Sequence, residues 1–245
     1  MPRYFLELSY RGGKYSGFQI QDNAGSIQEE VEKALEIVYR QKIALTGSSR
    51  TDTGVHAIQN FFHFDYESVI EDRTLYNLNA LLPLDIAVKR IYLVGPEAHC
   101  RFDATGREYR YYVYGAKNPF LDDRAYYFPY PLDREQMAAA AALLPEYTDF
   151  TAFAKRNSQV KTYECILRES RWEEAGDCLV YHVSANRFLR GMVRGLVGTM
   201  LQVGRGKLTL AQFRAVIEDR DNQRADFSVP GNGLFLFRVH FPVSL

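Results

Sequence analysis

The sequence predicts an α+β protein in which two ferredoxin-like β-α-β-β-α-β units share a broad antiparallel sheet, with a cleft between the halves. Three observations lead to this fold class. Short segments of alternating apolar and polar residues, typical of strands, are interrupted by segments with helical periodicity. The order of these segments over the first 94 residues recurs in the rest of the chain. No flexible linker separates the two copies, so we expect one rigid body with two halves, residues 1–104 and 105–245.

In the first half, residues 4–10 alternate and predict a strand. Ser26 and Glu29 have the spacing of a capping box, which predicts the start of a helix. The apolar residues that follow fall on one helical face, and they are Ile27, Val31, Leu35 and Val38. Further strands are predicted at 43–46, 58–65 and 86–94, and a second helix from Asp72 to Leu82, ended by Pro83.

The second half repeats the pattern, with its start near Asp103–Gly106. Strands are predicted at 108–115 and 233–240, and residues 162–172 and 178–184 form a hairpin around an acidic turn. The predicted helices run from Asp133 to Leu144, from Arg187 to Val203 and from Leu208 to Asp219.

Composition narrows the class of protein. Hydrophobic residues make up 47% of the 245 residues, which is typical of a globular chain. No apolar run approaches the roughly 18 residues of a membrane span, and the N-terminus lacks the layout of a signal peptide, so we expect a cytoplasmic protein. The three cysteines, Cys100, Cys165 and Cys178, are far apart and predict reduced, structural thiols. Motifs for a metal or a nucleotide cofactor are missing, so we expect neither.

Charge is balanced overall but unevenly distributed. Lysine and arginine total 30, as do aspartate and glutamate. Between Asn186 and Ile217, however, the charged residues are all basic, namely Arg187, Arg190, Arg194, Arg205, Lys207 and Arg214. Such a segment can hold phosphates, because neutralisation is local, or it can simply be a solvated surface. The charge pattern alone leaves both interpretations open.

The predicted helix from Arg187 to Val203 adds detail to this basic segment. At about 100° per residue, three arginines share one face, and they are Arg187, Arg190 and Arg194. Gly191, Gly195 and Gly198 lie beside them. The glycines either admit close packing of another segment or let a bulky polyanion approach the arginines, and both can hold.

A tyrosine-rich strand offers a second, weaker signal for nucleic-acid binding. Tyr109, Tyr111, Tyr112 and Tyr114 are interleaved with Arg107 and Arg110. Aromatic rings beside guanidinium groups suit unstacked RNA bases. A strand of this kind is more often a half-buried packing surface.

The loop GSSRTDTGVHA, residues 47–57, places Arg50, Asp52 and His56 among small residues. Taken alone, it is typical of an Asx-turn, in which aspartate bonds its own backbone. We expect His56 to be structural, since buried polar residues near loops are mostly satisfied by hydrogen bonds.

This loop resembles the G-R-T-D-A-G-V-H signature of the bacterial tRNA pseudouridine synthase A family, with Ser49 and Thr53 as departures. The resemblance covers nearly the whole chain, in family order. It includes YRGGKYSGFQIQ with SIQEEVEKAL, LNALLPLDIAVKRI, CRFDATGREYRYYVYG, NRFLRGMVRGLVGTMLQVGRGK and DFSVPGNGLFLFRVHFP.

The resemblance implies a uridine isomerase that acts on the 3′ side of the tRNA anticodon stem-loop, at positions 38, 39 and 40. It implies that Asp52 is the nucleophile and that Arg50 enters the stem as the target nucleotide leaves it. Tyr109 would stack on the flipped base, Arg194 would be the cation that favours an ionised Asp52, and Leu234 would form an apolar wall. Arg187 and Arg190 would contact the RNA backbone. The implied assembly is a homodimer without cofactor or metal, with the anticodon arm in a basic cleft.

Two alternative functions explain fewer features of the sequence. A non-catalytic RNA-binding module built from paired ferredoxin-like units should carry an RNP1-like strand, and no segment fits that pattern. A small-molecule enzyme on the same fold gives no reason for the basic segment without acids.

Overall fold

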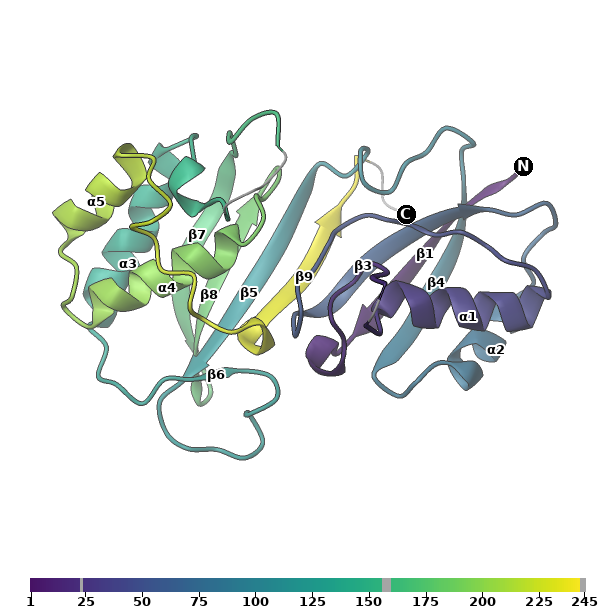
Figure 1. The fold of residues 1–245 in the computed structure, drawn as a ribbon, viewed down its shortest axis with the longest axis horizontal. Helices are drawn as coiled ribbons and strands as arrows, with labels where there is room; N and C mark the ends of the chain where they lie inside the picture. Colours follow the sequence, from purple (N-terminus) through teal and green to yellow (C-terminus); the bar gives the residue numbers. More distant parts are fainter. Residues whose placement is uncertain (23, 156–159, 243–245) are drawn as a thin grey trace. The chain divides into compact units, whose positions relative to one another are not determined.

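The computed structural model describes residues 1–22, 24–155 and 160–242. They form an α+β protein with five α-helices in the described ranges (Figure 1). The contacts group the chain into two compact units, one of Met1–Thr105 with the chain from Phe235 onward, and the other of Gly106–Leu234. None of the helices described is long and apolar enough to cross a membrane.

The first unit contains the elements β1 (Arg3–Tyr10), α1 (Ile27–Tyr39), β2 (Thr46–Gly47), β3 (His56–Asp65), α2 (Arg73–Leu81), β4 (Ile86–Val94) and, from Phe235 onward, β9 (Leu234–His240). Strand β1 is central and pairs antiparallel with both β3 and β4, while the short β2 pairs antiparallel with β3. Strand β9 pairs parallel with the start of β3. Figure 1 shows α1 and α2 side by side in front of these strands, and the two helices are in contact.

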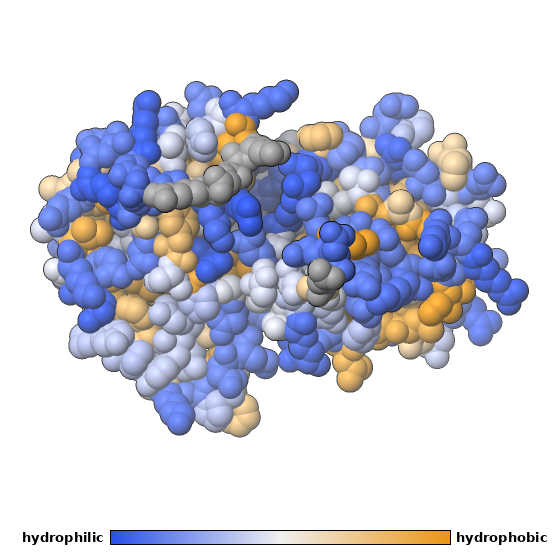
Figure 2. All heavy atoms as spheres, viewed as in Figure 1, coloured by the Kyte–Doolittle hydropathy of each residue, from blue (hydrophilic) through white to orange (hydrophobic). Residues whose placement is uncertain are grey.

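Local signals explain where α1 begins and which face it buries. The Ser26 side chain accepts a hydrogen bond from the Glu29 main-chain N–H at 3.2 Å and caps the helix. Val31 and Leu35 are fully buried, as the periodicity predicts. The helix ends at Tyr39, and the following Arg40 adopts the left-handed conformation that often stops helices. On the face drawn in Figure 2, hydrophilic side chains cover most of the surface of each unit, because the helices turn their apolar stripes inward.

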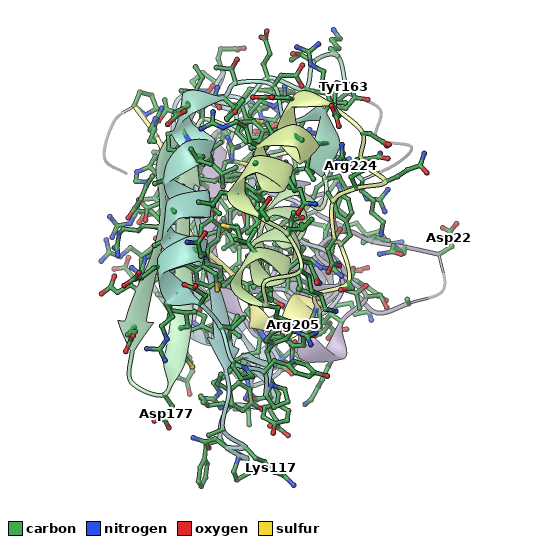
Figure 3. The ribbon with its side chains drawn as sticks, turned by 90° about the vertical axis from the view of Figure 1, so that its left-hand side faces the viewer. Asp22, Lys117, Tyr163, Asp177, Arg205 and Arg224 are labelled. Atoms are coloured by element: carbon green, nitrogen blue, oxygen red, sulfur yellow. The ribbon has the colours of Figure 1, made fainter. Side chains whose placement is uncertain are left out.

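The second unit contains β5 (Gly106–Tyr114), β6 (Tyr126–Tyr127), α3 (Arg134–Leu143), β7 (Leu167–Ala175), β8 (Cys178–Ala185), α4 (Met192–Gly204) and α5 (Leu210–Glu218). Strand β8 lies between β5 and β7 and pairs antiparallel with both. Helix α3 contacts α4, α5 and β7. Figure 3 looks onto this unit, with Asp177 in the turn between β7 and β8 and Arg205 just past the end of α4.

Two features of the sheet differ from the prediction. The strand expected to close the second half, β9, groups with the first unit from Phe235 onward, because Phe235 and Leu236 pair with His56 and Ala57. The strands are also mixed in direction, since β9 runs parallel to β3 and β6 runs parallel to β5. Local patterns identify a strand but do not specify its partner.

The predicted helix from Arg187 to Val203 is also too long at its start, because α4 begins at Met192. Gly191 before it has φ +74°, a conformation that interrupts a right-handed helix. The Arg190 carbonyl accepts a hydrogen bond from the Lys155 main-chain N–H, which fixes this segment outside the helix. Consequently Arg187, Arg190 and Arg194 do not share one helical face, and only Arg194 is helical.

Candidate active site

The loop that carries Arg50 and Asp52 connects β2 to β3 in the first unit. The main-chain N–H of Val55 donates to the Asp52 carbonyl at 3.2 Å and closes a turn, and Gly54 inside it has φ +78°. Arg50 is exposed and Asp52 is half-buried. The turn thus presents a carboxylate and a guanidinium within three residues of chain.

The segment from Gly12 to Phe18 lies directly against this turn. The Phe18 main-chain N–H donates to the Thr51 carbonyl at 3.1 Å. A Cβ at Gly12 would lie 2.0 Å from the Val55 carbonyl oxygen, so only glycine permits this approach of two backbones. Gly17 has φ +121°, and a Cβ there would lie 2.9 Å from the Thr51 carbonyl oxygen. The backbone of the turn is therefore held from one side by main-chain contacts.

A buried polar network holds the turn from the side of the sheet. Asn60 is fully buried on β3, and its Nδ2 donates to the Ser49 carbonyl at 2.9 Å and to the Tyr10 hydroxyl at 3.2 Å. The Tyr10 hydroxyl in turn bonds the Thr51 hydroxyl at 2.8 Å. Buried networks with every member satisfied make a backbone rigid, so this one fixes the residues on either side of Arg50.

His56 has a structural role in this unit, as predicted. Its ring is 2% exposed, and Nδ1 accepts a hydrogen bond from the Gly12 main-chain N–H at 3.1 Å. The ring also stacks on Phe235 with centroids 4.5 Å apart. His56 therefore joins the turn, the Gly12 segment and β9.

In the second unit, Tyr109 lies on β5 opposite Val183 of β8. Its half-buried ring meets the ring of Phe188 edge to face, with centroids 5.0 Å apart. Tyr111, two residues on and so on the same face of the strand, is fully buried. Its hydroxyl donates to the Pro230 carbonyl at 2.8 Å, and burial raises the pKa of Tyr111, so this hydroxyl keeps its proton.

Arg194 lies in the first turn of α4 and holds residues 226–230, which we call the strap. Its Nε donates to the Val229 carbonyl at 2.7 Å, and a terminal nitrogen donates to the Phe227 carbonyl at 3.4 Å. The main-chain N–H of Asp226 also donates to the Thr199 hydroxyl at 3.0 Å. The strap is thus tied along the length of α4.

The glycines of α4 serve this packing. A Cβ at Gly195 would lie 2.8 Å from the Phe227 ring, and one at Gly198 would lie 2.1 Å from the Asp226 carbonyl oxygen. The interpretation that these glycines admit close packing is confirmed. The alternative, that they leave the helix open to a polyanion, is wrong at Gly195 and Gly198, because the strap covers them.

The remaining predicted residues lie around these elements. Arg187 and Arg190 occupy the irregular segment between β8 and α4, on either side of Phe188 and Leu189, and Arg190 is exposed. Leu234 follows the strap at the start of β9 and is 7% exposed. Within the second unit, the structure therefore brings together Tyr109 and the basic segment through Phe188, and Arg194 with the strap.

Comparison with known proteins identifies the chain. A family model described as tRNA pseudouridine synthase matches residues 140–242. Over 247 aligned residues the chain is 47% identical to the tRNA pseudouridine synthase A of Parabacteroides distasonis, covering 100% of this chain and 98% of the relative. The chain belongs to the tRNA pseudouridine synthase A family.

Other family members match to a similar extent. The tRNA pseudouridine synthase A of Bacteroides thetaiotaomicron is 48% identical over 99% of this chain and 91% of its own. That of Bacillus subtilis is 38% identical over 96% of this chain and 97% of its own. Pseudouridine synthases are isomerases, and this chain is accordingly an isomerase.

The two departures from the loop signature fit the structure of this family member. Ser49 is buried, and its carbonyl accepts the hydrogen bond from Asn60. Thr53 is exposed, and its hydroxyl donates to the Ser16 carbonyl at 3.1 Å, which adds a further tie between the turn and the preceding segment. Neither side chain replaces an ionisable group.

Sequence reasoning missed several residues that shape the site. Phe188 was not singled out, and neither was the strap with its Asp226 and Val229 carbonyl contacts. Of the two interpretations of the tyrosine-rich strand, packing holds for Tyr111, which is a buried anchor for Pro230. The one available signal was strand alternation, which separates Tyr109 and Tyr111 from Arg110 and Tyr112.

Proposed function

We propose that this protein converts uridine to pseudouridine in tRNA, on the 3′ side of the anticodon stem-loop at positions 38, 39 and 40, with Asp52 as the nucleophile. The observation that carries the proposal is the Asp52 turn. Its backbone is held by Phe18, by Gly12 and, through Thr51, by the Tyr10 network, while the carboxylate-bearing residue stays half-exposed. The near full-length similarity to tRNA pseudouridine synthase A proteins supports the substrate.

The reaction sets clear demands on such a carboxylate. The N1–C1′ bond of uridine breaks, the uracil rotates, a C5–C1′ bond forms, and the proton leaves C5 while N1 gains one. The product has the composition of the substrate, so electrons balance within the nucleotide. An ionised carboxylate can attack C1′, attack C6 or assist a glycal route, and the proposal covers all three.

Residues of the Asp52 turn and of β5 have separate roles in the proposal. A uridine within a stem must leave the helix before it can react. The exposed guanidinium of Arg50 is suited to take its place and then to bind phosphate, because it is planar and always charged. Tyr109 stacks on the extruded base, and its hydroxyl helps to remove the C5 proton. The edge contact with Phe188 orients the Tyr109 ring before the base arrives.

The second unit also supplies charge and an apolar wall. Arg194 provides a positive charge, which favours the ionised form of a carboxylate nucleophile. Its guanidinium is oriented by the carbonyls of Phe227 and Val229. Leu234 forms the apolar wall. The exposed Arg190 and the half-buried Arg187 contact the RNA backbone.

We further propose that the protein acts in the cytoplasm as a homodimer and that each chain consists of two ferredoxin-like halves. The element order β1, α1, β2, β3, α2, β4 in the first unit supports the ferredoxin-like part. The molar mass of the purified protein, measured by light scattering, tests whether it is a dimer.

The central experiment replaces Asp52 by asparagine, which keeps the size of the side chain and removes its charge. Release of tritium from tRNA labelled at C5 of uridine should fall below detection, because an amide cannot form the adduct. Binding to tRNA, measured by filter retention, should persist, since phosphate contacts supply most of the affinity. Asp22→Asn, at an exposed position in Figure 3, is the matched control and should keep full activity.

Each part of the proposal can fail separately. A wild-type protein that releases no tritium from tRNA rejects the activity. An Asp52→Asn variant that releases tritium at a fair fraction of the wild-type rate rejects the nucleophile. Tyr109→Phe should retain binding and lose turnover, and full activity in that variant would reduce Tyr109 to a stacking platform.

A further inference from the structure

A groove of about 600 Å³ lies within the first unit, on strands β1, β3, β4 and β9. Along β1, the groove-lining Glu7 alternates with Leu6 and Leu8, which are fully buried. Successive side chains of a strand point to opposite faces, so the groove opens on the other face of the sheet from that of Leu6 and Leu8. No residue of the Asp52 turn lines it.

A β-bulge brings two cations to this groove. In the pairing of β1 with β4, Glu7 lies opposite Arg90 and Leu8 lies opposite Val88, which leaves Lys89 as the extra residue. A bulge of this kind changes the direction of side chains, so that two residues adjacent in sequence can lie on the same face of the sheet. Both Lys89 and Arg90 line the groove and both are exposed.

The opposite wall is basic as well. It consists of Arg238, Val239, His240 and Phe241. Arg238 is exposed and forms no ion pair with any residue in the described part of the chain. Lys89, Arg90 and Arg238 thus surround a groove in which Glu7 is the only carboxylate among the described residues that line it.

The Glu7 carboxylate is held in the groove by two hydrogen bonds and can accept more. It is 8% exposed, and its two carboxylate oxygens accept from Gln59 Nε2 at 3.0 Å and from the Tyr92 hydroxyl at 2.8 Å. Burial and the hydrogen bond to Glu7 raise the pKa of Tyr92, so that hydroxyl remains a donor. A carboxylate has about four acceptor positions, so Glu7 has capacity for a further donor from a ligand.

We propose that this groove, which no residue of the Asp52 turn lines, binds a ribonucleotide of the RNA substrate, with phosphate on Lys89, Arg90 and Arg238 and a nucleotide donor on Glu7. The inference rests on the proposed function, because it names a second contact of the same RNA. The donor is a 2′-hydroxyl, an exocyclic amino group or the imino N–H of a base, which are the groups of RNA that can donate to a carboxylate.

The combination of charges selects this ligand over others. A simple anion gains from the three cations but meets the Glu7 carboxylate, and an acidic protein segment would bring more carboxylates against it. A nucleotide carries both the phosphate and the donor. The volume lies within the roughly 300–1,000 Å³ of small-ligand sites, which suits a nucleotide and not a whole duplex.

The test compares the Arg90→Ala/Arg238→Ala double variant with Arg73→Ala, which removes an exposed cation from α2 of the same unit. The dissociation constant for tRNA is measured by filter retention over a series of salt concentrations. Each phosphate contact contributes roughly 0.7 to 0.9 to the slope of log K against log salt. The double variant should lose between about 1 and 2 from that slope and bind about tenfold more weakly at low salt, while Arg73→Ala should match wild type.

A second measurement separates this site from the catalytic one. In the double variant, single-turnover release of tritium should be about tenfold slower at subsaturating tRNA and should rise as the tRNA concentration is raised, because the variant weakens binding and leaves the Asp52 turn intact. An unchanged salt slope in the double variant, with an active wild type, overturns the inference. A changed oligomeric state with an unchanged slope would also overturn it and assign the groove to contact between copies. An inactive wild type would instead reject the proposed function.

Discussion

Replacing Gly12 by alanine tests whether the Asp52 turn is positioned by backbone contact. A Cβ at this position would lie 2.0 Å from the Val55 carbonyl oxygen, whereas real Cβ contacts essentially never fall below 3.0 Å. The two backbones must therefore separate by at least 1.0 Å, the difference between these two distances. Val55 closes the turn by donating to the Asp52 carbonyl, so the displacement reaches the proposed nucleophile.

The expected effect on rate follows from that displacement. A misplacement of about 1 Å can lower turnover by about 100-fold even when every catalytic group is retained. The clash should also lower the free energy of unfolding by about 1–3 kcal/mol, as overpacking of a rigid core does. Most of the protein should remain folded at 25 °C, so the loss of rate is measurable.

The assay is single-turnover release of tritium from C5-labelled tRNA, with a thermal melt of each variant. Gly13→Ala is the matched control, because a Cβ there meets nothing within 4 Å. It should keep the wild-type rate and melting temperature. A wild-type rate for Gly12→Ala would refute the reasoning and show that the turn tolerates the shift. A rate that recovers fully on cooling would assign the loss to unfolding instead.

Three further outcomes are expected. Gly198→Ala should lower the free energy of unfolding by about 1–3 kcal/mol in a urea titration, because its Cβ would lie 2.1 Å from the Asp226 carbonyl oxygen, and an unchanged midpoint would contradict the packing role. Arg194→Lys should lower turnover while keeping the charge, because lysine cannot bond both strap carbonyls from one plane; full activity would show that charge alone suffices. Burial, with His99 and Arg3 nearby, lowers the pKa of His63 to about 4. The folded state then binds fewer protons than the unfolded state between pH 4 and about 6.5, so stability should fall by up to about 3 kcal/mol as pH drops through that window. In a His63→Gln variant, the urea midpoint should depend less on pH between pH 4 and about 6.5 than it does in the wild type. The same pH dependence in both proteins would contradict the assignment of this effect to His63.

The local elements were predictable because their signals are local. The Ser26 cap and the apolar spacing after it specify α1, and the observed helix begins where they indicate. The short strand predicted at 43–46 is observed only as Thr46–Gly47, because a segment of that length has little pattern to read. The family and its isomerase class followed from six motifs spread along the chain, which the comparisons confirm.

Features that depend on tertiary contact could not be predicted. The left-handed Gly191 shortens α4, and nothing in the local spacing distinguishes it from the helical Gly195. The roles of Gly12 and Gly198 depend on which backbone crosses them. The bulge at Lys89 arises from the register between β1 and β4, and the sequence at 86–94 reads as an ordinary strand. Pairing of distant segments sets each of these features, and one sequence carries no direct record of it.

The two units fix their candidate residues by the same physical means. In the first, the backbone at Gly12 and Gly17 packs against the Asp52 turn, and in the second, the backbone of the strap packs against Gly198 of α4, the helix that carries Arg194. Main-chain contacts tolerate exchange of neighbouring side chains, because they depend on shape and not on side-chain identity. They do not tolerate an added Cβ at the point of contact. Activity should therefore be more sensitive to substitution at these glycines than at exposed residues of the same loops, such as Thr53.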